Sequence, residues 1–166
     1  MSQDSRLAPL ERDHPENRGV LRQLAGGRRS DEPPIARPSS MSDPYYDSGS
    51  HPDVVERVWD DLGRSLPRAC RALVFGTPAL VHASRGLVLC VALGTEYALR
   101  VPPARLQDAE QKGLAAFHRY RTSGTSLDLA GFGPAWRFGG WHACEADWLR
   151  ELHAELAAGD EREPGK

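Results

Sequence analysis

The sequence is poor in lysine, in net positive charge and in long apolar runs. Lys112 and Lys166 are its two lysines, so arginine supplies nearly all of the positive charge. The formal net charge is −2 over 166 residues, which gives no sign of the clustered basic face that nucleic-acid binders carry. Arg85 interrupts the longest apolar run, which falls short of the ~18–20 residues that a membrane-spanning helix needs. We therefore expect neither a nucleic-acid partner nor a membrane partner.

Cysteine is also scarce, and its odd number argues against a framework of disulfides. The three cysteines are Cys70, Cys90 and Cys144; with no secretory signal after Met1, they predict reduced thiols in a cytoplasmic protein. Cys90 lies in an apolar stretch, which disfavours a reactive thiolate. His142 and Cys144 form the one close His/Cys pair, and no second pair completes a zinc site. Without a nucleophile–base pair or paired carboxylates, we expect no metal, no cofactor and no enzymatic activity.

What the chain does have is one long apolar stretch, which predicts a β-meander. Turn-forming residues divide it into three predicted strands. The first runs from Arg71–Phe75 on to Ala79–Ala83, the second covers Gly86–Leu93 and the third covers Thr95–Val101. In the last strand three apolar residues alternate with Glu96, Ala98 and Arg100. That alternation predicts a sheet with one buried face and one wetter face.

Amphipathic segments on either side of this stretch are predicted to be helices. A first helix begins at Pro52 behind a capping pair, Ser50 and Asp53, and ends before Pro67. Trp59 belongs to its apolar stripe and is expected to be a core anchor. A short helix follows over Ala104–Lys112, and Gly131–Trp141 resumes extended structure.

The C-terminal segment predicts a further helix, whose apolar stripe includes Trp148 and Leu152 and which ends at Gly159. The fold class predicted is α+β, an antiparallel β-meander covered on one face by the N- and C-terminal helices.

The composition divides the chain into one domain and two tails. Residues 1–49 are rich in proline and mixed charge, which predicts a disordered N-terminal tail. The domain is expected over residues 50–159 and a disordered C-terminal tail over 160–166. Within the N-terminal tail, Pro15 is expected to interrupt any helix, and Met41 is a plausible alternative start. Tyr45 and Tyr46 are expected to mark the point where the tail touches the domain.

Several short motifs occur in a fixed order over residues 51–158. They are a Phe75-Gly76 turn, Tyr97 followed by Arg100 and Pro102, and a Trp148-Leu149 pair. In this order they resemble the N-terminal domain of the TfoX competence-regulator family and the related YjbR-type small domains. The resemblance implies a compact α+β domain. Because no helix-hairpin-helix domain follows, it does not imply the DNA-processing role of full-length members.

The remaining candidates for function are surface residues. Arg100 and Glu96 on the wetter face are either a surface ion pair or part of a partner-binding site, to which Trp136, Arg137 and Trp141 also belong. We expect a non-enzymatic binding, adaptor or regulatory module whose partner is another protein or a second copy of the chain. The alternatives are a regulatory protein linked to competence or nucleic-acid processing, and a small secretion-chaperone-like protein.

Overall fold

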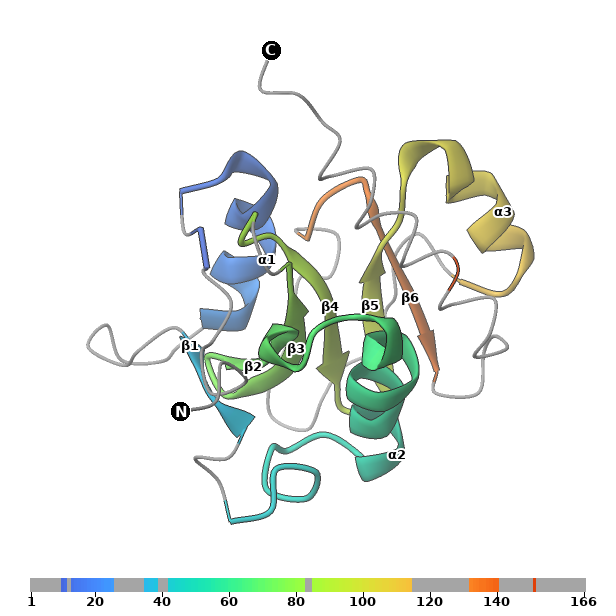
Figure 1. Cartoon of the computed structure of the whole chain (residues 1–166). Helices are drawn as coiled ribbons and strands as arrows, with labels where there is room; N and C mark the ends of the chain where they lie inside the picture. The colour runs from blue at the N-terminus through green and yellow to red at the C-terminus, as the bar shows by residue number, and fades with distance from the viewer. Residues whose placement is uncertain are drawn as a thin grey trace.

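The computed structural model of the chain describes residues 10–11, 13–25, 35–38, 42–82, 85–114, 132–140 and 151. These residues form a six-stranded antiparallel sheet in which each strand pairs with the next one along the chain (Figure 1). The predicted α+β class with an antiparallel meander is confirmed. The strands are β1 (Ile35–Ala36), β2 (Arg71–Val74), β3 (Thr77–Val81), β4 (Val88–Leu93), β5 (Glu96–Arg100) and β6 (Trp136–Gly140).

The first predicted strand is in fact a hairpin. Strands β2 and β3 are antiparallel, with Val74 opposite Thr77. The two residues between them, Phe75 and Gly76, have φ values of 49° and 79°. Two left-handed residues are the signature of a tight hairpin turn that matches the twist of the strands. The Phe75-Gly76 turn stood among the motifs of the family resemblance, but the apolar run alone did not predict a hairpin there, because phenylalanine rarely adopts a positive φ. In the structure the Phe75 ring is buried.

One helical layer covers one face of the sheet, which we call the α2 face. It comprises α2 (Pro52–Glu56), a π-helical turn (Arg57–Asp61) and two 3-10 turns (Leu62–Ser65 and Arg68–Cys70). Trp59 is 1% exposed, and its indole Nε1 donates a 3.1 Å hydrogen bond to the carbonyl of Ala79 in β3. The prediction that Trp59 anchors the core is confirmed.

The cap of α2 differs from the predicted one. His51 precedes the helix, and its Nδ1 accepts the backbone N–H of Asp53 at 3.1 Å. Ser50 serves another purpose, because its hydroxyl oxygen accepts the backbone N–H of Gly94 at 3.2 Å. The segment before α2 is thereby fixed to the β4–β5 turn.

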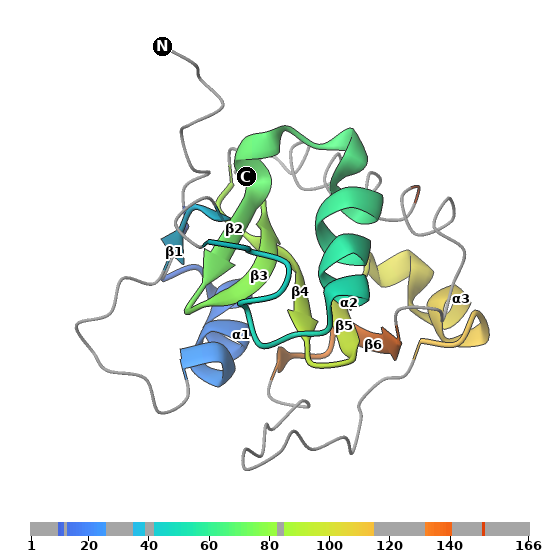
Figure 2. The ribbon, with the colours of Figure 1, turned by 90° about the horizontal axis from the view of Figure 1, so that it is seen from below.

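A second helix, α1 (Pro15–Ala25), packs on the opposite face of the sheet, as Figure 2 shows. The prediction of a single covered face is therefore wrong. Val20, Leu21 and Leu24 of α1 are buried in an apolar cluster with residues of β2 to β6. Pro15 does not interrupt this helix but begins it, because the first helical N–H needs no partner within the helix.

The predicted domain boundary at residue 50 also changes. The expectation of a disordered tail over residues 1–49 is wrong for α1 and for β1, which pairs with β2. Residues 1–9, 12, 26–34 and 39–41 of that stretch lie outside the described residues. The predicted C-terminal helix with Trp148 and Leu152, and the tail over 160–166, lie outside them as well, except for the exposed helical residue Glu151.

The sheet ends in a short helix and an edge strand. A 3-10 turn (Pro103–Arg105) leads into α3 (Leu106–Gln111), close to the predicted Ala104–Lys112. Strand β6 then pairs with β5 along its whole length, which places Trp136 opposite Arg100. No helix in the described part of the chain is long and apolar enough to cross a membrane.

Candidate protein-binding surface

The structure places the predicted partner-binding residues mostly in the interior. Arg100 is 4% exposed, and Trp136 and Arg137 are also buried. Glu96 is half-buried, and Trp141 lies outside the described residues. The prediction that Arg100 points to a wet face is wrong, because α1 covers that face.

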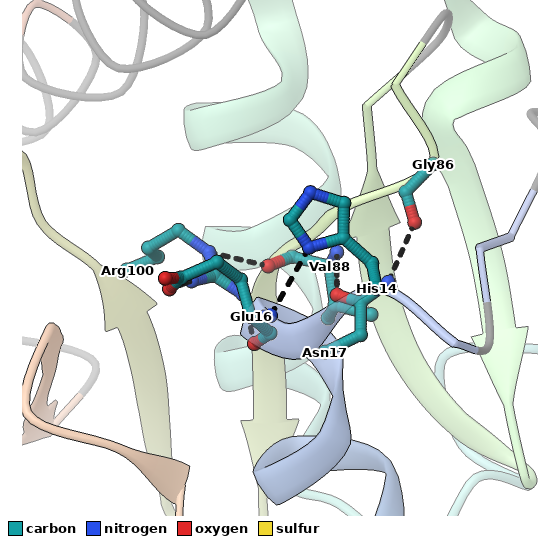
Figure 3. Close-up of polar contacts among 6 residues, drawn as sticks. All are labelled: His14, Glu16, Asn17, Gly86, Val88 and Arg100. Atoms are coloured by element: carbon teal, nitrogen blue, oxygen red, sulfur yellow. Dashed lines mark hydrogen bonds and ion pairs between the residues drawn. The ribbon is translucent and has the colours of Figure 1, made fainter.

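Arg100 is at the centre of a buried polar cluster that joins α1 to the sheet. Its guanidinium donates to the carbonyl of Val88 at 3.0 Å, to the carboxylate of Glu16 at 3.0 Å and to the carbonyl of Glu16 at 2.9 Å (Figure 3). Its guanidinium carbon also lies 5.0 Å from the centre of the Trp136 ring, a cation–π distance. A buried charge of this kind is tolerated because hydrogen bonds and an opposite charge surround it.

Asn17 completes this cluster from the first turn of α1. Its side chain is fully buried. It donates to the carbonyl of Gly86 at 2.9 Å and accepts the N–H of Val88 at 2.9 Å (Figure 3), and it also donates to the carbonyl of Glu11 at 2.7 Å. One amide thus satisfies two backbone groups at the start of β4. We call the set His14, Glu16, Asn17, Gly86, Val88 and Arg100 the polar latch.

Both helical layers begin with the same local sequence, a signal that sequence reasoning missed. His14-Pro15-Glu16 opens α1 and His51-Pro52-Asp53 opens α2. In each motif the histidine Nδ1 accepts the backbone N–H two residues on, at 3.0 Å for Glu16 and 3.1 Å for Asp53. Proline at the first helical position and an acid in the first turn complete a recognisable helix start. Since the sequence already predicted the helix that begins at Pro52, the same motif at His14 could have predicted the helix that begins at Pro15.

The exposed large hydrophobic side chain among the described residues lies in the loop before α2. We call residues 42–50 the tyrosine loop. Tyr46 is 69% exposed, whereas its neighbour Tyr45 turns inward and packs edge-on against Trp59, with ring centres 5.4 Å apart. The Tyr45 hydroxyl donates to the carboxylate of Asp60 at 2.8 Å. The expectation that the two tyrosines mark a contact with the domain is met by Tyr45.

The surroundings of Tyr45 perturb its acidity. Partial burial, followed by the hydrogen bond to Asp60 and the negative charge of that carboxylate, raises the pKa of Tyr45 to about 12. Asp60 also pairs with Arg71 of β2 at 3.0 Å. The tyrosine loop is therefore attached to the sheet through the π-helical turn; turns of this kind occur often at functional sites.

Hydrogen bonds within the tyrosine loop fix its shape. The Asp47 carboxylate accepts the Ser42 hydroxyl at 2.6 Å and the N–H of Asp43 at 3.1 Å. The carbonyl of Asp43 in turn accepts the N–H groups of Tyr46 at 3.1 Å and Asp47 at 2.8 Å. Tyr46 is thus presented to solvent from a loop held on both sides.

Acidic residues flank Tyr46 in the sequence. Asp43 and Asp47 in the tyrosine loop, and Asp53 and Glu56 in α2, are exposed. Arg57 lies in the next turn and pairs with Asp61 at 3.2 Å. Along residues 42–56 one exposed aromatic ring is thus accompanied by four exposed carboxylates.

The interior holds a thiol in an apolar setting. Cys90 is fully buried beside a β-bulge, where Leu89 has no residue opposite it in β3. Burial raises the pKa of the Cys90 thiol well above its ordinary value. Among the described residues no group of three or more His, Cys, Asp and Glu side chains is placed to hold a metal ion.

The fold and this surface define a class, a small α+β domain whose antiparallel meander lies between two helical layers and carries an exposed aromatic loop. Comparison of the chain with protein-family models, with curated proteins and with solved structures gives no match.

Proposed function

We propose that the protein is a non-enzymatic binding module that acts in the cytoplasm as an adaptor or regulatory domain toward a protein partner. The observation that carries this proposal is the tyrosine loop, which presents the exposed Tyr46 from a hydrogen-bonded frame. Tyrosine is enriched among the residues that dominate protein–protein binding energy. A loop that is already ordered loses less conformational entropy on binding, so more of the contact energy appears as affinity.

The charge around Tyr46 indicates the kind of partner. Exposed carboxylates at Asp43, Asp47, Asp53 and Glu56 favour a basic segment over an acidic one, because complementary charge steers and orients association. An arginine of such a segment would also gain from stacking on the Tyr46 ring.

The buried polar residues support a binding role over a catalytic one. Asn17 and Arg100 hold α1 on the sheet. Arg137 holds α3 near β6, through a 2.9 Å ion pair with Glu110 and a 2.9 Å hydrogen bond to the carbonyl of Pro134. Each of these side chains uses its donors to join structural elements. The resemblance to the TfoX N-terminal domain stays a prediction, based on the sequence motifs that include Phe75-Gly76 and Tyr97.

The proposal is tested by changing Tyr46 without disturbing the fold. Tagged wild type and Tyr46→Ala are used to capture partners from native lysate, and the captured proteins are quantified by mass spectrometry. We expect at least one protein to be retained by the wild type and by Arg18→Ala, an exposed control on α1, but depleted at least tenfold with Tyr46→Ala. Size-exclusion chromatography with light scattering tests whether that partner is a second copy. Equal capture by Tyr46→Ala and wild type would refute a role for the loop.

A further inference from the structure

Within the tyrosine loop, the chain from Asp43 to Asp47 forms a single helical turn. The carbonyl of Asp43 accepts the N–H of Asp47, four residues on, at 2.8 Å, and the N–H of Tyr46 at 3.1 Å. An isolated turn of this kind is unfavourable for the backbone alone, because several dihedral angles are fixed for very few hydrogen bonds. Side chains must therefore help to hold it.

Asp43 begins this turn in the way that histidines begin α1 and α2. Its carboxylate accepts the N–H of Tyr45, two residues on, at 3.3 Å. Pro44 follows Asp43 as Pro15 and Pro52 follow the two histidines, and proline has a φ that suits the first helical position. The combination of a side-chain acceptor and a proline thus occurs a third time, at the turn that presents Tyr46.

Asp47 closes the turn from its other end. Its carboxylate accepts the N–H of Asp43 at 3.1 Å and the hydroxyl of Ser42 at 2.6 Å, while its own N–H donates to the carbonyl of Asp43. Asp43 and Asp47 are therefore bonded to each other in both directions, as the two residues of a capping box are. Hydrogen bonds to an ionised carboxylate are stronger than those between neutral groups.

We propose that Asp47 is the positioning residue of Tyr46, and that it contributes to partner binding through the shape of the turn rather than through its charge. This inference rests on the proposed function, in which the exposed Tyr46 ring contacts the partner. The carboxylate of Asp47 joins the chain before Tyr46 to the chain after it. A ring held in this way loses less conformational entropy when a partner binds.

Amide hydrogen exchange of the full chain, followed by NMR and corrected for intrinsic rates, tests the turn in the free protein. Asp47→Ala removes the acceptor and should speed exchange of the Tyr46 amide by about three- to tenfold. Asp47→Asn keeps an acceptor oxygen and should restore most of the protection. Glu56→Ala removes the same charge outside the loop and should leave the Tyr46 amide unchanged. Equal exchange of that amide in wild type and Asp47→Ala would overturn the proposal.

Binding of an arginine peptide tests the consequence for partner binding. The probe is fluorescein-labelled nona-arginine, followed by anisotropy. Asp47→Asn and Glu56→Ala each remove one negative charge, so they should weaken binding alike. Asp47→Ala should weaken it by a further factor of about three to ten, because the turn is lost as well. Equal binding by Asp47→Ala and Asp47→Asn would overturn the proposal.

The two measurements separate this inference from the proposed function. Wild type that fails to bind the peptide, with faster exchange of the Tyr46 amide in Asp47→Ala, would refute the basic partner of the proposed function and support Asp47 as the residue that positions Tyr46. Binding that needs Tyr46 but is the same for Asp47→Ala and Asp47→Asn would support the proposed function and refute the positioning role.

Discussion

The two faces of the sheet are covered by helices that begin alike and are held differently. On the α2 face, Val55, Val58 and Trp59 fill an apolar cluster with the sheet. On the α1 face, apolar contacts are joined by Asn17 and Arg100, which are buried and hydrogen-bonded. Apolar burial scales with area and has little direction, whereas buried polar groups stabilise only in one geometry. We therefore expect the α2 face to contribute more to the free energy of unfolding, and the polar contacts of the α1 face to fix the position in which α1 packs on the sheet.

The largest effect should come from the α2 face. Trp59→Ala removes a buried indole and its bond to Ala79, and should lower the free energy of unfolding by about 3–5 kcal/mol. Urea denaturation followed by circular dichroism measures this loss. Glu56→Ala, exposed on the same layer, should change it by less than about 0.5 kcal/mol. A loss for Trp59→Ala as small as that of the control would mean that this face does not carry the core.

The α1 face should respond to a polar change. Asn17→Ala leaves the buried N–H of Val88 without its partner and removes one of the two donors to the carbonyl of Gly86, which keeps the N–H of Glu11 at 3.2 Å, and it should cost about 2–3 kcal/mol. The same urea titration measures it, with Arg18→Ala as an exposed neighbour that should be nearly neutral. An Asn17→Ala loss as large as that of Trp59→Ala would mean that the two faces contribute equally to the free energy of unfolding.

A smaller effect should appear at the attachment of the tyrosine loop to the α2 face. Tyr45→Phe removes the hydrogen bond to Asp60 and should cost about 1 kcal/mol or less at neutral pH. The pKa of Tyr45 is raised from 10.0 to about 12 in the folded protein, so the folded form holds its proton more tightly than the unfolded form. This contribution is full below pH 10.0 and is lost as the pH rises toward about 12.

The urea midpoints of wild type and Tyr45→Phe should accordingly converge between neutral pH and pH 12. Tyr46→Phe is the matched control, because the Tyr46 ring is exposed. The difference between its urea midpoint and that of wild type should not shrink as the pH rises. A gap between wild type and Tyr45→Phe that widens with rising pH would contradict the assignment.

The smallest effect, almost no alkylation, is expected at Cys90 in the apolar cluster between α2 and the sheet. Cys90 should stay unmodified when the native protein meets iodoacetamide at neutral pH, because burial raises its pKa and the thiolate is the reacting form. Peptide mapping by mass spectrometry identifies the alkylated cysteines, and the urea-unfolded protein, in which Cys90 should react, is the control. Rapid labelling of Cys90 in the native protein would mean that this cluster opens readily.

The sequence predicted the α2 face well because its signals are local. The helical spacing of its apolar residues, the turns within Arg71–Val101 and the alternation of β5 all depend on neighbours in the chain. The α1 face was missed because Asn17 and Arg100 look like surface residues until the fold brings them together. Alternation placed Arg100 on the correct side of β5, but it could not indicate that a helix preceding Met41 covers that side. The apolar run was predicted to be one strand across Phe75 and Gly76, although the family resemblance marked a turn there, because the positive φ of Phe75 contradicts the preference of phenylalanine.

The meander has a consequence for the order of folding. Strands β2 to β5 pair in chain order and are joined by short connections, so their hairpins close one after another as the chain leaves the ribosome. Contacts of the polar latch are of another kind, since Glu16 and Arg100 are separated by 84 positions. The first helix to be synthesised must wait until β5 has emerged before it can dock. Nascent chains stalled before residue 100 should therefore expose the apolar side of α1, and it is during this interval that the growing chain is most open to chaperones.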